Sequence, residues 1–299
     1  KDISKITAQI TPTTFEYTGN AVCPAATVKD GTKELVAGTD YVVTYTNNAD
    51  LMAKIASTLS EKEGDRYDGD AKKYAALFED LKAKFNERFV KDGDLTERTQ
   101  CTYLMALRFG LVDGEVRENC IKNLANKIKA SGYKLSTGFV GTGMLNQTLS
   151  EIGEDSLAYS LLLQGENPSW IYSLRQGATT VWERWNSYEL AFQQGGESSM
   201  NSFNHFALGS VGSWLWEYHL GITSDSGRGY KEFTLQPLPG GTYSSADGTY
   251  HSSYGAIRSA WTADAGSLTS YSCTVPANTS ATLYLPVEAS SMEGFAAAE

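Results

Sequence analysis

One short stretch of the sequence, GATTVWERWNSYE at residues 177–189, places a carboxylate, Glu183, between two tryptophans and beside an arginine. The β-branched run before it favours an extended backbone, so we expect Glu183 and Trp185 to share a face. An indole can cover the apolar face of a pyranose while a carboxylate handles hydroxyls or an attacking water, which suits a carbohydrate site. The alternative is an ion pair of Glu183 with Arg184 or Arg175 among core tryptophans. Spacing alone does not separate these two interpretations.

A second polar group stands in SMNSFNHFALGSVGSWLWEYHLGI, at residues 199–222. Asn204 and His205 lie at the mouth of a predicted helix, where they could act as caps or as ligands. Small residues follow them and favour close packing of that helix against its neighbours. For His219 and His251 we expect structural roles.

Three zones of composition must position these groups. Residues 1–48 contain turn signals between short β-prone runs such as YVVTYT, which predicts an antiparallel β module. Residues 49–222 are predicted to be helical, since in KKYAALFEDLKAKFNERFV apolar residues recur at three-, four- and seven-residue spacing. Residues 223–299 return to alternating strand patterns, which predicts a C-terminal β-sandwich.

The helical zone contains both clear helices and interruptions. We expect helices at about 97–109, 115–130, 143–151, 154–164 and 204–221. GFVGTGML and QGENPSWIYSLRQGATT are expected to be long loops, and sites are often built on such loops in a helical array.

Composition narrows the function classes. The chain has 25 basic and 35 acidic residues and a net charge of −10, so nucleic acid and anionic membranes are poor partners. No apolar run approaches the ~20 residues of a membrane span. Four cysteines and three histidines lack ligand spacing, so we expect no metal, no cofactor and no disulfide framework. The opening KDISKITAQI contains no signal peptide and is typical of a segment of a longer protein.

Several motifs occur in the order of a known family. GATTVWERWNSYE, the 199–222 segment and GYKEFTLQPLPGG…SYGAIRSAW resemble the C-terminal half of bacterial α-L-rhamnosidases of glycoside hydrolase family 78. LSTGFVGTGMLNQTLSEIG and GDLTERTQCTYLMALRFGLV are similar to the same family, so the resemblance covers roughly residues 49–286. It implies part of an (α/α)6 barrel of helical hairpins followed by an antiparallel β-sandwich.

The resemblance also implies a chemistry, the inverting hydrolysis of terminal α-L-rhamnosides. In that chemistry one carboxylic acid protonates the leaving oxygen and a carboxylate activates water. By resemblance Glu183 is the general base and His205 lines the rhamnose pocket. The weaker matches for pocket walls are Trp182, Trp185 and Asn204, and then Phe139 and Thr142. The implied partner is a rhamnose-containing glycoside or polysaccharide.

One part of the family pattern is absent. The general acid of the family lies in a CPQRDER-like motif followed by GWTGD, and neither phrase occurs in this chain. Glu97 and Arg98 in GDLTERTQC fit a later helical region of the family and do not replace the acid. The resemblance therefore implies a site with weak or lost activity.

The first zone resembles a different family. ITPTTFEYTGNAVCPAATVKDGTKELVAGTDYVVTYTNN is similar to the immunoglobulin-like repeats of surface and secreted proteins of Gram-positive bacteria, which implies an extracellular or cell-surface location. The helical zone follows at once, so the chain joins a partial immunoglobulin-like module to a partial barrel. Apolar faces left uncovered by a partial barrel are expected to favour association.

Two alternatives to a hydrolase remain open at this point. One is a non-catalytic carbohydrate-binding or surface-adhesion protein, in which the barrel segment only binds rhamnose. The other is a rearranged gene product that folds in part and has no activity.

Overall fold

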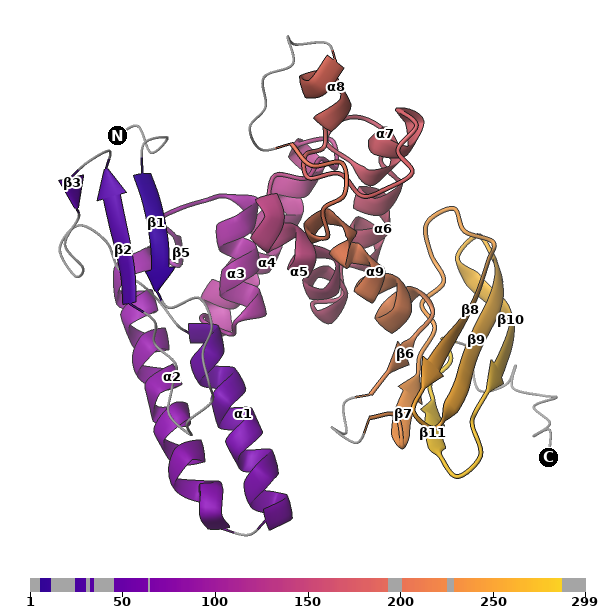
Figure 1. Ribbon diagram of the computed structural model, residues 1–299, viewed down its shortest axis with the longest axis horizontal. Coiled ribbons are helices and arrows are strands. Elements are labelled where there is room, and N and C mark those ends of the chain that lie inside the picture. Colours follow the sequence, from indigo (N-terminus) through magenta and orange to yellow (C-terminus); the bar gives the residue numbers. More distant parts are fainter. Residues whose placement is uncertain are drawn as a thin grey trace. The chain divides into compact units, whose positions relative to one another are not determined.

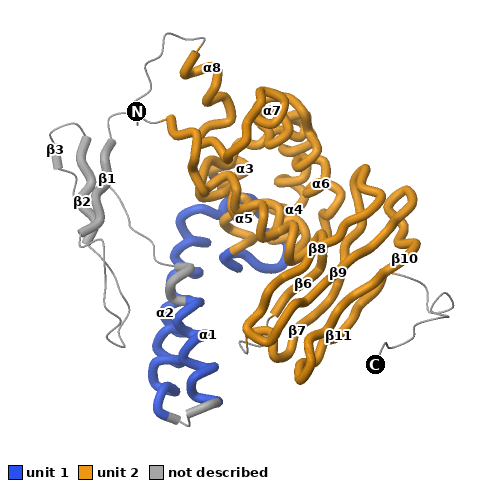
Figure 2. The backbone as a smooth tube through the Cα atoms, turned by 45° about the vertical axis from the view of Figure 1, so that its right-hand side comes forward, with its two compact units in different colours: residues 1–96, 109–116 blue, residues 97–108, 117–299 orange. Residues whose placement is uncertain are grey.

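The computed structural model describes residues 6–11, 25–30, 33–34, 46–63, 65–192, 201–224 and 229–286. The chain divides into two compact units, drawn in blue and orange in Figure 2. The first unit comprises residues 1–96 and 109–116, and the second comprises residues 97–108 and 117–299. The second unit holds both the tryptophan-flanked glutamate and every strand from β6 onward.

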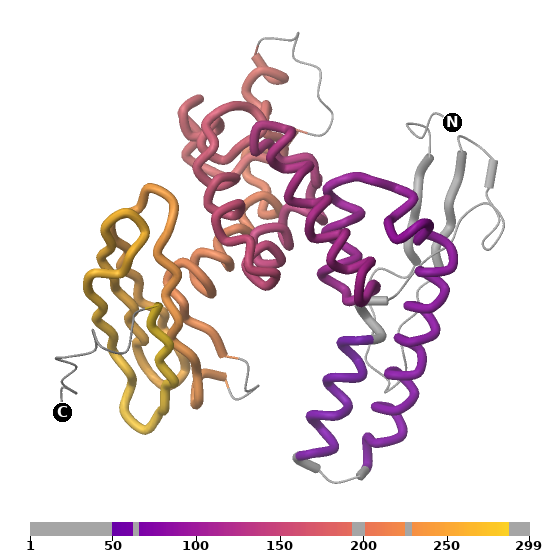
Figure 3. The backbone as a smooth tube through the Cα atoms, turned by 180° about the vertical axis from the view of Figure 1, so that it is seen from behind, coloured from indigo at the N-terminus to yellow at the C-terminus, as the bar shows by residue number. Residues whose placement is uncertain are grey.

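A helical hairpin forms most of the described part of the first unit. Helix α1 (Thr46–Glu63), the 3-10 turn η1 (Asp65–Tyr67) and helix α2 (Asp68–Phe89) follow one another, and the two helices lie side by side (Figures 1 and 3). The apolar stripe predicted for α2 explains this pairing, because its Tyr74 is fully buried. The other members of that stripe are only half-buried, and Leu51 of α1 is 51% exposed. The hairpin therefore keeps apolar surface beyond its own contact.

Short strands precede this hairpin in the sequence. Strands β1 (Ile6–Thr11), β2 (Ala25–Asp30) and β3 (Lys33–Glu34) form an antiparallel sheet in that order, the arrangement expected for residues 1–48. The remaining residues before Thr46 lie outside the described residues, so the immunoglobulin-like identity stays a prediction. Helix α1 already begins at Thr46, slightly before the predicted end of the β module.

A tight hairpin follows α2. Strands β4 (Val90–Lys91) and β5 (Asp94–Leu95) are antiparallel and are joined by Asp92 and Gly93, both with positive φ. An Asp-Gly pair is the usual sequence signal for such a two-residue turn.

Helices α3 (Gln100–Arg108), α5 (Gly138–Glu151) and α6 (Asp155–Leu163) belong to the second unit, as does α4 (Gly114–Ala130) from Arg117 onward. Helices α4 and α6 match their predicted ranges within one residue. Helix α5 does not, because GFVGTGML forms its first turns instead of a loop. Its glycines permit close packing, since a Cβ placed on Gly143 would lie 3.0 Å from the Ser210 Oγ. Tertiary packing here overrides the low helix propensity of glycine.

The second expected loop also contains a helix. Within QGENPSWIYSLRQGATT, α7 (Trp170–Arg175) begins at the N-cap Ser169, whose hydroxyl accepts a hydrogen bond from the Tyr172 N–H at 3.0 Å. Helix α8 (Ser187–Phe192) then follows the WERW motif. The helix predicted at 204–221 consists of three consecutive segments. They are the 3-10 turn η2 (Ala207–Ser210), the α-helical turn α9 (Val211–Trp214) and the π turn η3 (Leu215–His219).

The C-terminal region contains two three-stranded sheets, with strand orders β11-β7-β6 and β10-β9-β8. The strands are β6 (Ile222–Thr223), β7 (Glu232–Leu235), β8 (Ser245–Ser252), β9 (Gly255–Asp264), β10 (Ser267–Thr274) and β11 (Ser280–Leu283). The C-terminal β-sheet domain is thus confirmed. One pair differs from the antiparallel expectation, because β11 runs parallel to β7.

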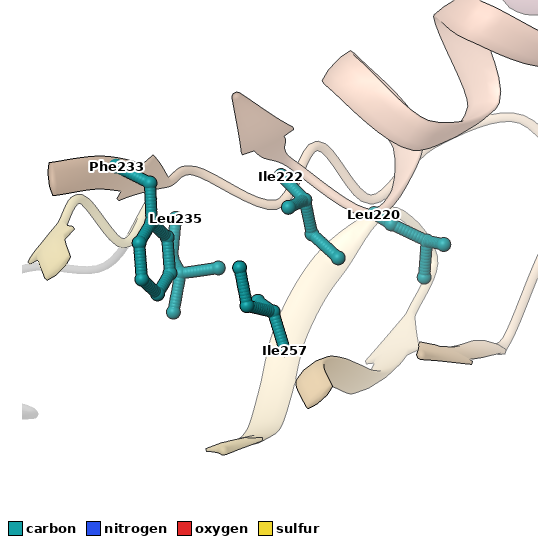
Figure 4. Close-up of a cluster of buried hydrophobic side chains, with 5 residues drawn as sticks. All are labelled: Leu220, Ile222, Phe233, Leu235 and Ile257. Carbon is teal, nitrogen blue, oxygen red and sulfur yellow. The ribbon is translucent and has the colours of Figure 1, made fainter. Parts of the chain in front are cut away.

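The two sheets share a core (Figure 4). Leu220, Ile222, Phe233 and Leu235 pack from one side against Ile257 of β9, and all five are buried. Burying side chains of this size contributes about 1.5–3 kcal/mol each. Since Leu220 directly follows the π turn η3, this core also anchors the end of the helical region to the sheets.

No helix among the described residues is long and apolar enough to span a membrane. The described cysteines, Cys101, Cys120 and Cys273, carry free thiols.

Candidate active site

Two segments of the second unit pair at the predicted site. The His205 N–H donates to the Val181 carbonyl at 2.8 Å, and the Glu183 N–H donates to the Ser202 carbonyl at 2.8 Å. These bonds hold the end of the TTVWE run beside SFNH. The structure thus brings together the WERW and NH motifs, which stand roughly twenty residues apart in the sequence.

The Glu183 carboxylate is buried, with 7% of the residue exposed. Its Oε2 accepts a hydrogen bond from the Ser202 N–H at 2.7 Å, and its Oε1 has no partner among the described residues. Arg175 donates instead to the Gly165 carbonyl at 3.1 Å, and Arg184 is exposed. Within the described part of the chain neither arginine pairs with Glu183, so the ion-pair alternative is wrong. A buried carboxylate held by one neutral donor keeps a free oxygen that can accept a proton.

The two tryptophans of the motif belong to different aromatic clusters. Trp182 is 5% exposed, stacks on Tyr188 with ring centroids 6.5 Å apart, and meets Phe203 edge-on at 5.5 Å. Trp185 meets Trp170 edge-on at 5.3 Å. Trp182 is therefore enclosed by aromatic rings and supports the Glu183 loop through this packing. Trp185 is only half-buried.

The extended backbone expected through the motif ends at Glu183. The Ser187 hydroxyl accepts a hydrogen bond from the Arg184 N–H at 3.1 Å, and the Ser187 N–H donates to the Arg184 carbonyl at 3.2 Å. These bonds close a turn that leads into α8, so the alternation rule does not extend to Trp185. The extended backbone from which we predicted a shared face for Glu183 and Trp185 therefore does not continue to Trp185.

His205 lies half-buried between two exposed rings. Its ring stacks on Phe139 at 5.0 Å and on Phe206 at 5.4 Å, and these phenylalanines are 44% and 84% exposed. Its Nδ1 accepts a hydrogen bond from the Ala207 N–H at 3.3 Å. In the neutral ring the proton is then on Nε2, which has no partner among the described residues. His205 can therefore donate to an external hydroxyl from the aromatic platform formed with Phe139 and Phe206.

The three remaining predicted site residues differ in whether they lie at the site. Asn204 is exposed beside His205, and its N–H donates to the Ser202 hydroxyl at 3.1 Å. Phe139, on α5, is brought to the site by its stacking on His205. Thr142 is 1% exposed and shares a 2.9 Å hydrogen bond with Thr137, so it is enclosed in α5 packing and does not form a pocket wall.

Sequence reasoning missed two contributors to this site. Ser202 supplies the N–H that fixes the Glu183 carboxylate, and the Phe206 ring stacks on His205 in addition to Phe139. A main-chain donor leaves no signal in residue type. The exposed Phe206, in contrast, stands directly after the NH motif and could have been noticed as an aromatic neighbour.

Among the residues with described positions, no group of three or more His, Cys, Asp or Glu side chains is arranged to hold a metal ion.

Two protein-family models match this chain. Residues 27–219 match the family model of the bacterial alpha-L-rhamnosidase six-hairpin glycosidase domain, and residues 221–295 match the model of the bacterial alpha-L-rhamnosidase C-terminal domain. The chain belongs to the bacterial α-L-rhamnosidase family. The predicted rhamnosidase resemblance is thereby confirmed, with the boundary between its two domains at the end of the π turn η3.

Individual relatives agree with the family assignment. An alpha-L-rhamnosidase of Formosa agariphila is 37% identical over 87% of this chain, and one of Streptomyces avermitilis is 36% identical over 87%. The crystal structure of the Streptomyces avermitilis alpha-L-rhamnosidase complexed with L-rhamnose superimposes with a TM-score of 0.72 at 34% identity over 81% of this chain and 23% of that one. The native Aspergillus terreus enzyme gives a TM-score of 0.71 at 33% identity over 81% of this chain and 28% of that one.

This rhamnosidase-family chain is much shorter than those relatives. It spans 27% and 24% of the length of the two curated relatives. The six-hairpin match also starts at residue 27, within the segment predicted to be immunoglobulin-like.

Proposed function

We propose that this chain carries the general-base half of an inverting α-L-rhamnosidase site, with Glu183 as the base. The observation that carries the proposal is the Glu183 carboxylate itself. It is 7% exposed, has one oxygen fixed by the Ser202 N–H and one oxygen free of described partners, and forms no ion pair within the described residues. A carboxylate in this state is positioned to take a proton from water.

The neighbouring residues then have defined tasks. His205 donates from Nε2 to a sugar hydroxyl, and the Phe139 and Phe206 rings beside it offer apolar surface to the C–H face of a rhamnosyl unit. Asn204 provides an exposed amide at the same edge. Trp182 and Trp185 hold the Glu183 loop in place through their aromatic clusters.

In the proposed reaction Glu183 removes a proton from a water molecule as that water attacks the anomeric carbon. The bond to the aglycone oxygen breaks with inversion, and a carboxylic acid on the other side of the ring protonates that oxygen. The two carboxyl groups of an inverting pair stand ~6.5–9.5 Å apart. The acid motif of the family does not occur in this sequence, so we assign to this chain the base and not the proton donor.

The test uses two substrates that differ in their need for an acid. A 4-nitrophenyl α-L-rhamnoside has a leaving group that departs without protonation, whereas the methyl α-L-rhamnoside requires it. We expect the chain to hydrolyse only the nitrophenyl compound, and proton NMR should show the inverted β anomer first. Glu183→Gln should lower that rate by about 10²–10⁴-fold. The matched control is Glu79→Gln on an exposed position of α2, which should retain the rate. A rate indifferent to Glu183 would exclude it as the base.

A second candidate is a rhamnose-binding protein without turnover. The observation that favours it is the absence of the acid motif from the sequence. Calorimetric binding of L-rhamnose, weakened by His205→Ala, together with no release of nitrophenol would support this candidate over the hydrolase.

A further inference from the structure

A cavity of about 630 Å³ lies in the second unit where the helical region meets the C-terminal sheets. Its walls come from the end of α5, the start of α6, the π turn η3, and the segments around β6, β7 and β11. Neither Glu183 nor His205 lines it. Its volume is in the range of pockets that hold small molecules, about 300–1,000 Å³.

Asp155 at the start of α6 contributes a carboxyl group to the wall of this cavity. Its Oδ1 is buried and has no hydrogen-bond partner among the described residues. Burial raises the pKa of this carboxyl, while a hydrogen bond with Ser150 opposes the shift. Because Asp155 lines the cavity, its carboxyl can accept a hydrogen bond from a ligand hydroxyl there.

The charged side chains that line the cavity carry a net negative charge. Arg108 forms an ion pair with Glu151, so its charge is already compensated. Burial, followed by the charges of Glu151 and Glu217, raises the pKa of Tyr218 to about 12, and the phenol therefore stays protonated as a donor. This surrounding disfavours phosphate and carboxylate ligands.

The remaining wall is aromatic and aliphatic. Tyr230 and Tyr284 face the cavity together with Pro237 and Leu238. Tyr284 is 56% exposed, so its ring is accessible from solvent. Rings beside acceptors and a phenol donor form the combination that binds sugars, because a pyranose presents an apolar C–H face and a rim of hydroxyls.

We propose that this cavity is a second saccharide site, separate from Glu183, which holds one neutral pyranose unit between Tyr284 and the Asp155 carboxyl. A metal ion is the less suitable occupant, since the described residues include no set of three His, Cys, Asp or Glu side chains arranged as ligands. The choice of rhamnose as the sugar rests on the proposed function, whereas the existence of the site does not.

The test follows backbone amide signals of the full chain by nitrogen-15 NMR during titration with L-rhamnose. The Tyr284 and Asp155 amides should shift with saturation. Tyr284→Ala should weaken that binding about three- to tenfold, and Asp155→Asn should weaken it as well, with both variants melting at the wild-type temperature. Tyr254→Ala is the matched control, because Tyr254 is a 44% exposed tyrosine of the C-terminal domain that does not line the cavity.

The outcomes separate this proposal from the proposed function. Shifts at Tyr284 that persist in His205→Ala support the second site even if hydrolysis proves independent of Glu183. Unmoved Tyr284 and Asp155 amides, or equal binding by wild type, Tyr284→Ala and Asp155→Asn, would overturn the second site and leave the role of Glu183 intact. Shifts caused by sodium phosphate but not by rhamnose would overturn the neutral-sugar assignment.

Discussion

Two histidines, His205 and His219, stand at opposite ends of one helical segment and carry their protons on opposite ring nitrogens. At His205 the Nδ1 accepts from the Ala207 N–H, which leaves the proton on Nε2. At His219 the Nδ1 lies 2.7 Å from the Tyr159 hydroxyl, and that hydroxyl donates its single proton to the Leu238 carbonyl. The His219 Nδ1 must therefore be the donor.

The surroundings of the two rings explain what each can do. His205 is half-buried between exposed phenylalanines, whereas His219 is 7% exposed within a cage formed by Tyr159, Trp214, Tyr243 and Trp261. His219 has its Nδ1 donor used inside the protein, and His205 has its Nε2 donor available outside. Residue type alone does not distinguish a structural histidine from a binding one, but the partner of Nδ1 and the exposure of the stacking rings do.

The largest expected effect comes from opening the His219 cage. Trp261 is 2% exposed, and its indole N–H donates to the His219 carbonyl at 2.8 Å. Trp261→Ala removes both the packing and the donor, and it should lower the free energy of unfolding by about 3–5 kcal/mol. Thermal melting followed by circular dichroism measures this loss.

The control for that experiment is Trp185→Ala at the candidate active site, where the ring is only half-buried. We expect it to cost clearly less stability than Trp261→Ala. Equal losses of stability in the two variants would mean that the active-site loop is packed as firmly as the His219 cage, and the contrast between the two regions would not hold.

The second effect is a pH dependence specific to His219. Burial lowers the pKa of His219 to about 4, below the ordinary value of about 6.5 for histidine in an unfolded chain. Between these values the unfolded state binds more protons than the folded state. The stabilisation is therefore complete above about pH 6.5 and is lost as the pH falls toward 4. At pH 4 the loss should be about 3 kcal/mol.

Urea unfolding of wild type and His219→Gln at pH 7 and pH 4 isolates this contribution from that of other titrating groups. The difference between the two proteins should shrink at pH 4. Leu174→Ala, which removes no titratable group at a 61% exposed position, serves as the control variant, and its difference from wild type should be the same at both pH values. An unchanged His219→Gln difference would show that the cage does not exclude the charged ring.

Periodicity was sufficient to predict some elements but not others. Helix α4 has apolar residues three and four positions apart over 114–130 and matches its predicted range within one residue. The start of α5 was missed, because GFVGTGML contains three glycines, two of which, Gly141 and Gly143, allow close approach of neighbours such as Ser210. Strand β8 has the sequence SADGTYHS, which contains no apolar run, and its position depends on pairing with β9.

The candidate site could also be predicted only in part from the sequence. Glu183 and His205 could be selected from motifs, since their residue types carry the chemistry. The pairing of the two segments that carry them could not be predicted, because it depends on main-chain hydrogen bonds to the Val181 and Ser202 carbonyls and on the stacking of Phe139 on His205. Main-chain hydrogen bonds between distant segments depend on the tertiary fold and not on residue type.

The smallest change in stability is expected at Phe206, although its effect on binding should be measurable. Phe206 is 84% exposed and contacts His205 on one face, so Phe206→Ala should change the free energy of unfolding by no more than about 0.5 kcal/mol. If the ring forms part of the rhamnose platform, its removal should weaken L-rhamnose binding at His205 by about two- to fivefold, monitored by the His205 ring protons in NMR titrations. Leu174→Ala, at a 61% exposed position of α7, provides a matched loss of exposed apolar surface and should leave that affinity unchanged. An equal affinity for wild type and Phe206→Ala would remove Phe206 from the platform, and His205 would then bind the sugar with Phe139 alone.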